Sequence, residues 1–159
     1  MTWYKSDADL PPLEDYDLIN HPRTYRYFDK PVLYPFGFGL SYTAFDYKHL
    51  CVEKYSCGGL KVSVDVTNTG AVCGDEVAQL YIRRVSASKT VHPLRRLIGF
   101  ERLHDLVPGE TKKAEFIVNP CDLEIYAEDE GKKIIEPGKY LVYAGGNCLD
   151  ERVVMEVEL

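Results

Sequence analysis

The sequence predicts an all-β domain, a sandwich of seven to eight short strands that follows an irregular N-terminal arm. Three observations support this prediction. From residue 43 onward, apolar and polar residues alternate, which is the period of a strand with one buried face. Turn sequences such as Asn68-Thr69-Gly70 and Pro108-Gly109 separate the alternating segments. No segment carries a convincing apolar stripe of helical spacing.

The arm, residues 1–42, differs in composition from the rest of the chain. It is rich in Pro, Tyr and Asp, and the stretch 9–17 (DLPPLEDYD) combines two prolines with four acids, which is typical of loops. Residues 23–28 (RTYRYF) fit a short extended piece. The sequence therefore divides into an arm over 1–42 and a sandwich over 43–159. We expect order from about Val32, docked next to the first strand, and disorder or intermolecular packing before it.

The clearest strand is 60–67, where one face carries Leu60, Val62, Val64 and Val66. This face is predicted to point into the core. Strands are expected over 45–49, 60–67, 76–83, 95–102, 112–118, 133–136, 139–144 and 152–158, whereas 119–129 fits at most one or two helical turns. Seven or eight short strands in one domain are typical of an immunoglobulin-like or fibronectin type III-like β-sandwich. A barrel is the alternative.

Composition and charge exclude several classes of function. The 159 residues carry a formal net charge of −6, which disfavours a nucleic-acid partner or an anionic membrane surface. No apolar run is long enough to span a bilayer, so no membrane partner is expected. The five cysteines are odd in number and scattered, at 51, 57, 73, 121 and 148. They predict free thiols and a bacterial cytoplasmic location rather than secretion.

No catalytic, metal or cofactor site is predicted. Nucleophile elbows, HExxH, Walker loops and GxGxxG motifs are absent from the sequence, and the glycines of 37–39 (GFG) precede no helix. The acids of 14–17 and 128–130 are neighbours in polar loops, whereas acid–base catalysis needs acids held apart in a cleft. The four histidines, at 21, 49, 92 and 104, have no visible Cys or Ser partner. No Cys or His spacing fits zinc.

Aromatic side chains are the remaining signal. Pro35, Gly37 and Gly39 break up the segment that carries the densest aromatic patch, so this segment cannot form a regular strand. Such aromatics either anchor the arm on a neighbouring domain, which we favour, or form a carbohydrate-stacking platform. The residues predicted to make the interdomain contact are Tyr25, Tyr27, Phe28, Tyr34, Phe36, Phe38 and Tyr42.

Several long motifs resemble one family. Residues 23–47 (RTYRYFDKPVLYPFGFGLSYTAFDY) resemble the linker into the C-terminal domain of glycoside hydrolase family 3 enzymes, the β-glucosidases and β-xylosidases, with Phe38 where Tyr is common. Residues 64–82 (VDVTNTGAVCGDEVAQLYI) and 92–110 (HPLRRLIGFERLHDLVPGE) resemble that domain itself, with His92 in place of the usual Arg. Residues 2–16 resemble the end of the preceding α/β domain in xylosidase-like members.

This resemblance implies a fibronectin type III-like accessory domain. In the family, the nucleophile is an aspartate on an N-terminal barrel and the acid/base is a glutamate on the following α/β domain. This chain contains neither, so no residue inherits a catalytic role and the fragment is not expected to be an enzyme. The implied partners are the barrel and α/β domains of a parent that hydrolyses terminal β-xylosides or β-glucosides, with homodimerisation left open. The alternative is a carbohydrate- or cell-wall-binding module.

Overall fold

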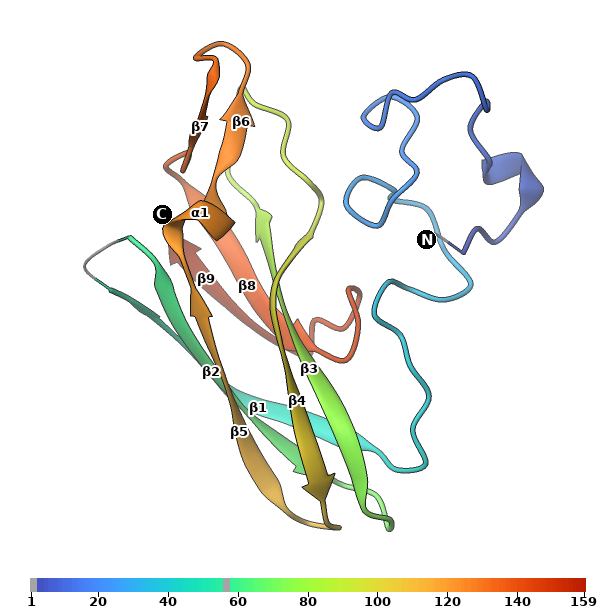
Figure 1. The fold of residues 1–159 in the computed structure, drawn as a ribbon, viewed down its shortest axis with the longest axis vertical. Helices are drawn as coiled ribbons and strands as arrows, with labels where there is room; N and C mark the ends of the chain where they lie inside the picture. Colours follow the sequence, from blue (N-terminus) through green and yellow to red (C-terminus); the bar gives the residue numbers. More distant parts are fainter. Residues whose placement is uncertain (1–2, 56–57) are drawn as a thin grey trace.

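The computed structural model describes residues 3–55 and 58–159, and its architecture is a β-sandwich with an arm beside it (Figure 1). One antiparallel sheet has the order β1-β2-β5 and the other has the order β4-β3-β8-β9. The strands of the two sheets are β1 (Phe45–Lys54), β2 (Leu60–Asn68), β3 (Gly74–Arg84), β4 (Arg96–Leu106), β5 (Thr111–Val118), β8 (Lys139–Gly145) and β9 (Val153–Glu158). The remaining elements are a 3-10 turn (Asp7–Asp9), α1 (Pro120–Leu123), and a hairpin of β6 (Ile125–Ala127) and β7 (Lys132–Ile134).

The core lies between the two sheets, on the faces that the alternation predicts. Leu60, Val62, Val64 and Val66 of β2 are all fully buried, as predicted. They share one core cluster with Ala78, Leu80 and Ile82 of β3 and with alternate residues of β5 and β8. Burial of each such aliphatic side chain contributes roughly 1.5–3 kcal/mol, so this interface is the main source of stability. The predicted sandwich is confirmed.

Two strands, β1 and β4, run well past their predicted ends because bulges interrupt their alternation. Strand β1 continues past His49 to Lys54, and its register with β2 shifts between Lys48 and Cys51. At His49 the backbone has φ 53°, a left-handed conformation that is uncommon outside glycine. The predicted strand end at residue 49 is therefore a bulge. The sequence also missed the three-residue strand β6, which is too short to show a period.

Strand β4 extends to Leu106, beyond its predicted end at 102, and Asp75 holds its far end. The backbone at Asp105 has φ 51°, and its N–H donates to Asp75 Oδ1 at 2.9 Å. Arg102 donates to Asp75 Oδ2 through Nε at 3.0 Å and Nη2 at 2.8 Å, and His104 Nδ1 lies 3.1 Å from the same oxygen. These contacts, first the Asp105 backbone bond and then Arg102, lower the pKa of Asp75 to about 2.

A second apolar cluster lies on the outer face of the β4-β3-β8-β9 sheet. Tyr81, Tyr143 and Cys148 are buried there, although no second sheet covers them. Tyr25 and Phe36 of the arm pack on this cluster. The molecule therefore has three layers, namely two sheets and the arm. The arm contacts the sheet through Tyr25, before the predicted boundary of order at Val32.

The described cysteines, Cys51, Cys73, Cys121 and Cys148, are all free thiols, as predicted, and Cys57 lies outside the described residues. In the part of the chain that the structure describes, no helix is long and apolar enough to cross a membrane.

We predict that Val64→Asp prevents folding. Val64 is fully buried between the sheets, so the variant would place an unpaired carboxylate in the core, at a cost of about 4 kcal/mol or more. Far-UV circular dichroism with urea titration measures this effect. Ser63→Asp is the matched control, because it places the same group on the outer face of β2 and should cost less than about 1 kcal/mol. Cooperative unfolding of Val64→Asp near the parent midpoint would show that the strand register is wrong.

We also predict an acid-sensitive contribution from Asp75. Its pKa is about 2 in the folded chain and about 3.9 when unfolded, so its stabilising effect is complete above about pH 5 and is lost progressively as the pH falls towards about 1. Urea unfolding at several pH values should show a shallower loss of stability over this window in Asp75→Asn than in the parent. Asp129→Asn, the same change in an exposed loop, should follow the parent. Parallel curves for parent and Asp75→Asn would contradict the assignment.

Candidate functional site

Gln79 of β3 links the arm to the sandwich through side-chain hydrogen bonds. Its Nε2 donates to the carbonyl oxygen of Gly37 at 3.0 Å and to that of Gly146 at 2.7 Å, while its Oε1 accepts from the Tyr81 hydroxyl at 2.5 Å. Gly37 has φ +85°, and a Cβ at this position would collide with Gln79 Oε1. Glycine is therefore required here both for its backbone conformation and for the close approach of Gln79.

Stacked rings extend this attachment over the outer face of the sheet. Tyr25 and Phe36 stack with centroids 4.1 Å apart, and Tyr25 meets Tyr81 edge-on at 6.4 Å. Tyr81 in turn stacks on Tyr143 at 5.3 Å. Burial raises the pKa of both Tyr81 and Tyr143, so both rings stay neutral at physiological pH. Such ring pairs add about 0.5–1.5 kcal/mol each beyond the area that they bury.

Backbone bonds fix the arm at both ends of this stack. The N–H of Leu97 in β4 donates to the Tyr25 hydroxyl at 3.2 Å. The N–H of Cys148 donates to the carbonyl oxygen of Phe36 at 2.9 Å. The N–H of Leu94 donates to the backbone carbonyl oxygen of Arg26 at 2.7 Å. The arm is thus held in a defined position although it forms no regular strand.

The structure divides the seven aromatic residues predicted for an interdomain contact into two groups. Tyr25 and Phe36 are half-buried on the chain's own sheet, and Phe28 is only 4% exposed, packed edge-on against Tyr4. Tyr27 is half-buried. The exposed members are Tyr34 at 52%, Phe38 at 44% and Tyr42 at 99%. The interdomain role stays a prediction, and these exposed residues are the ones still accessible to a partner.

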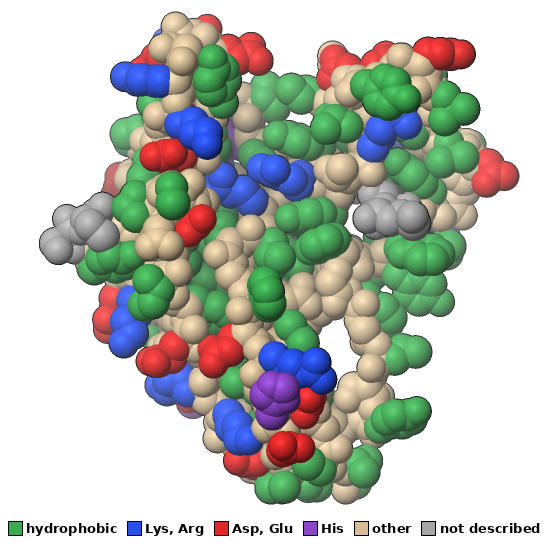
Figure 2. Space-filling model, in the orientation of Figure 1, with side chains coloured by type: hydrophobic (Ala, Val, Ile, Leu, Met, Phe, Trp, Pro, Cys, Tyr) green, Lys and Arg blue, Asp and Glu red, His purple; other side chains and the backbone are tan. Residues whose placement is uncertain are grey.

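The exposed members belong to an outward row, which we define as Trp3, Tyr34, Phe38, Leu40 and Tyr42. Trp3 meets Tyr34 edge-on at 6.0 Å, and Tyr34 meets Phe38 at 5.4 Å with the rings tilted by 32°. Leu40 is also almost fully exposed. Figure 2 shows apolar side chains along the side of the molecule that the arm forms. Several large apolar side chains exposed on one segment are typical of an interaction surface.

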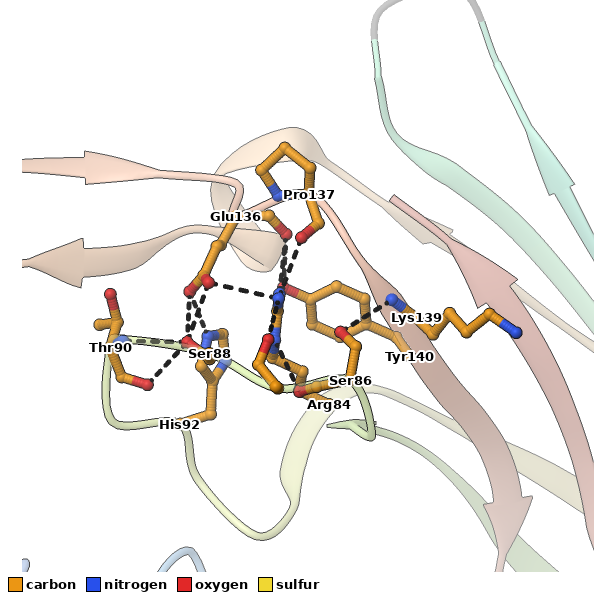
Figure 3. Close-up of polar contacts among 10 residues, drawn as sticks. Arg84, Ser86, Ser88, Thr90, His92, Glu136, Pro137, Lys139 and Tyr140 are labelled. Atoms are coloured by element: carbon orange, nitrogen blue, oxygen red, sulfur yellow. Dashed lines mark hydrogen bonds and ion pairs between the residues drawn. The ribbon is translucent and has the colours of Figure 1, made fainter.

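One polar cluster has the residue types of a catalytic triad, but its geometry is different (Figure 3). His92 Nε2 lies 2.8 Å from Glu136 Oε2, and Ser88 Oγ donates to the same carboxylate at 2.8 and 2.9 Å. In a triad the histidine stands between the hydroxyl and the acid. Here Glu136 stands between Ser88 and His92, so the histidine cannot take the serine proton.

Arg84 makes this cluster structural. Its side chain is 5% exposed and donates to the carbonyl oxygens of Glu136 and Pro137, at 3.1 and 3.0 Å, and to the Tyr140 hydroxyl at 2.9 Å. Burial would raise the pKa of Glu136, but hydrogen bonds from His92 and Ser88 and the Arg84 charge together lower it. The cluster ties the β3–β4 loop to the turn before β8.

The other histidines and acids, for which the sequence predicts no catalytic role, are paired or solvated. His21, His49 and His104 lie about 3 Å from Asp15, Asp65 and Asp75 respectively. Asp17, in the acidic loop, accepts backbone N–H bonds from Ile19 and Asn20. Among the described residues, no three His, Cys, Asp or Glu side chains are placed to hold a metal ion.

Sequence reasoning missed the Gln79 attachment. The alternation in β3 does place Gln79 and Tyr81 on the face opposite Leu80, but nothing local indicates that this face is covered. One signal could have indicated it. Gln79, a long polar side chain, and Tyr81, a large aromatic one, occupy neighbouring positions on the same outward face of β3.

The chain is similar in sequence and in structure to one domain of several known glycosidases. The sequence model of the fibronectin type III-like domain family matches residues 76–148. Xylan 1,4-beta-xylosidase of Xylanibacter ruminicola is 42% identical over 152 residues, which cover 95% of this chain and 17% of that protein. Beta-D-glucoside glucohydrolase of Trichoderma reesei superposes with a TM-score of 0.84 at 29% identity, over 99% of this chain and 26% of that one. The GH3 beta-glucosidase of Bifidobacterium adolescentis superposes with a TM-score of 0.77 at 32% sequence identity, over 85% of this chain and 20% of that one.

The chain thus spans about a fifth of the length of these relatives. The likeness includes the arm as well as the sandwich, since the match to the xylosidase covers nearly the whole chain.

We predict that Gln79→Ala loosens the arm but leaves the sandwich folded. The change leaves the Gly37 and Gly146 carbonyl oxygens and the Tyr81 hydroxyl without their partner, at a cost of about 1–3 kcal/mol. Amide hydrogen exchange should accelerate at Cys148, whose N–H bonds to Phe36, while amides of β2 keep their protection.

The matched control is Val77→Ala, two residues away on the same face of β3. It removes apolar contact without removing a hydrogen bond, and Cys148 exchange should stay at the parent rate. Equal exchange at Cys148 in Gln79→Ala and in the unmodified chain would show that the arm is held without the Gln79 side chain.

Proposed function

The chain carries a fibronectin type III-like domain homologous to that of family 3 β-xylosidases and β-glucosidases, and on this premise we propose that it is a non-catalytic accessory domain. It packs on the catalytic domains of a larger glycoside hydrolase and stabilises them. The parent enzyme acts on terminal β-xylosides or β-glucosides. The observation that carries the proposal is the outward row, an exposed set of large apolar side chains on an arm that is firmly docked.

Two features of the arm support this role. Its inner side is fixed by Gln79 and by the Tyr25–Phe36 stack, so its outer side is presented in one conformation. A partner that binds a preorganised surface does not have to order it, which favours association. We therefore assign residues 1–42 to the connection with a preceding α/β domain and 43–159 to the accessory domain, with the barrel and α/β domains as partners.

The polar clusters fit an accessory role. His92, Glu136 and Ser88 bond in an order that cannot activate the serine, and Arg84 is occupied with backbone carbonyl groups. The exposed free thiols Cys51, Cys73 and Cys121 fit a reducing compartment, so we propose a cytoplasmic location for the parent.

A carbohydrate-binding module is the second candidate, because the same aromatic row could contact sugar. Its geometry is less suitable for this. Trp3 and Tyr34 are nearly perpendicular, at 88°, and Phe38 is tilted from Tyr34, so the rings do not form one flat platform. Side chains at mixed angles instead fit an irregular protein surface.

We predict that replacing Tyr34, Phe38 and Tyr42 together with Ser destabilises the parent enzyme but not the isolated chain. These side chains are exposed in the chain alone, so its unfolding free energy should change by less than about 1 kcal/mol. In the parent they would be buried against the catalytic domains, and their loss should cost several kcal/mol. Thermal melts of both proteins, with residual glycosidase activity of the parent after heating, measure the difference.

Ile117→Ser is the control, since Ile117 is exposed on β5, in the other sheet. It should leave the melting midpoint of the isolated chain and that of the parent enzyme unchanged. Equal melting of the triple variant and the unmodified parent enzyme would contradict the docking role. Retention of the isolated chain on insoluble xylan, abolished in the triple variant, would favour the carbohydrate-binding alternative.

A further inference from the structure

The side chain of one arginine of the arm has no hydrogen-bond or ion-pair partner among the residues that the structure describes. Arg26 is half-buried, and its Nε is inaccessible to solvent without a hydrogen-bond acceptor. Within residues 3–55 and 58–159, no carboxylate or carbonyl oxygen lies within bonding distance of its guanidinium. Buried polar groups without partners are rare in native proteins, and a water or ion that completes the site is one of their explanations. A partly desolvated guanidinium without an anion is costly.

A second guanidinium lies close to the first. Arg96 of β4 donates through Nη1 to the carbonyl oxygen of Glu124 at 2.8 Å and through Nη2 to that of Asp122. Burial lowers the pKa of Arg96, and the nearby positive charge of Arg26 lowers it further. The two guanidinium groups therefore repel each other at the junction of the arm and the sheet, and the nearby Asp122 carboxylate offsets only part of this effect on the pKa of Arg96.

Both arginines line one groove, of about 580 Å³, between the arm, the β3–β4 loop and the β6–β7 hairpin. Figure 2 shows Lys and Arg side chains gathered in the hollow between the hairpin and the arm. Lys89 and Lys133 add positive charge to the lining. The groove also contains carboxylates, at Glu124, Glu128 and Asp129, and among the described residues none forms an ion pair with Arg26.

We propose that Arg26 and Arg96 form a binding site for a carboxylate group, with Arg26 as the residue that pairs with it. A guanidinium presents its N–H groups in a planar fork that matches the two oxygens of a carboxylate. Arg96 has two of its donors engaged with backbone carbonyl groups, so it contributes mainly positive charge, while Arg26 offers free donors. An anion between the two would satisfy Arg26 and relieve the repulsion.

Two sources provide this chemistry, a free organic acid and an Asp or Glu side chain of an adjoining protein surface. Tyr27, Ile19 and Tyr126 line the same groove, and the last two are at least half exposed. These apolar side chains would contact the backbone and neighbours of a protein-borne carboxylate more than a small acid. The side-chain source rests on the proposed function, whereas the carboxylate site itself does not.

The test uses the isolated chain with sodium malonate and, separately, the blocked peptide acetyl-Ala-Glu-Ala-amide, both at constant ionic strength with sodium chloride as balance. Melting midpoints and amide chemical shifts are followed against ligand concentration. The unmodified chain should show saturable stabilisation, with amide chemical-shift changes concentrated at Arg26, Tyr27 and Arg96. Arg26→Met keeps the apolar stem and removes the charge, and it should weaken binding at least about tenfold.

Two further variants sharpen the result. Arg26→Lys keeps the charge without the fork and should bind with intermediate affinity. Lys48→Gln removes an exposed cation on β1 outside the groove, and this variant should bind both ligands with the affinity of the unmodified chain. Tighter binding of the peptide than of malonate assigns the site to a protein side chain, and the reverse order assigns it to a free acid.

The proposal is overturned if neither ligand gives saturable stabilisation of the unmodified chain, or if Arg26→Met binds the ligands as tightly as the unmodified chain does. Because these measurements need no catalytic domain, they stand whether or not the accessory role is correct. If the triple aromatic variant leaves the parent enzyme unchanged while malonate binds at Arg26, only the docking role fails.

Discussion

Strand β3 must be covered on both faces, and the rest of the structure depends on this requirement. On one face Ala78, Leu80 and Ile82 enter the core between the sheets. On the other face Tyr81, with Tyr143 from the neighbouring strand β8, would be exposed if the arm were absent. Burying two tyrosine rings stabilises the fold by a few kcal/mol, a sizeable part of the net stability of a domain. The arm is therefore a structural layer of this chain.

The sequence predicts the two-sheet core well and the third layer poorly, for one physical reason. The core faces follow from period-two alternation, which is local, so Leu60 and Val64 are assigned correctly from their neighbours alone. The contact of Tyr25 with Tyr81 joins residues far apart in the chain, and no local pattern encodes it. The bulges at His49 and Asp105 are missed for a related reason. Each is stabilised by tertiary contacts such as the bond from Asp105 to Asp75.

The polar clusters show why a list of residue types could not decide function. The sequence left four histidines without partners, yet each pairs with a carboxylate, and His92 and Glu136 are 44 residues apart. Ser88 completes the set of types that a hydrolase uses, but the order of the bonds excludes that chemistry. Only the arrangement distinguishes a cluster that fixes a loop from one that activates a nucleophile.

The arm separates two kinds of interaction by the side on which they occur. Towards the sheet it uses neutral groups, namely the Gly37 carbonyl, the Phe36 ring and the Tyr25 hydroxyl, and these are satisfied within the chain. Away from the sheet it leaves Tyr34 and Tyr42 exposed, and in the groove it leaves Arg26 unpaired. Holding these groups on a docked segment costs conformational entropy during folding, so a partner that covers them later gains their burial without ordering the arm. That asymmetry, with groups satisfied on the inner side and exposed elsewhere, supports the position proposed for the arm between two domains.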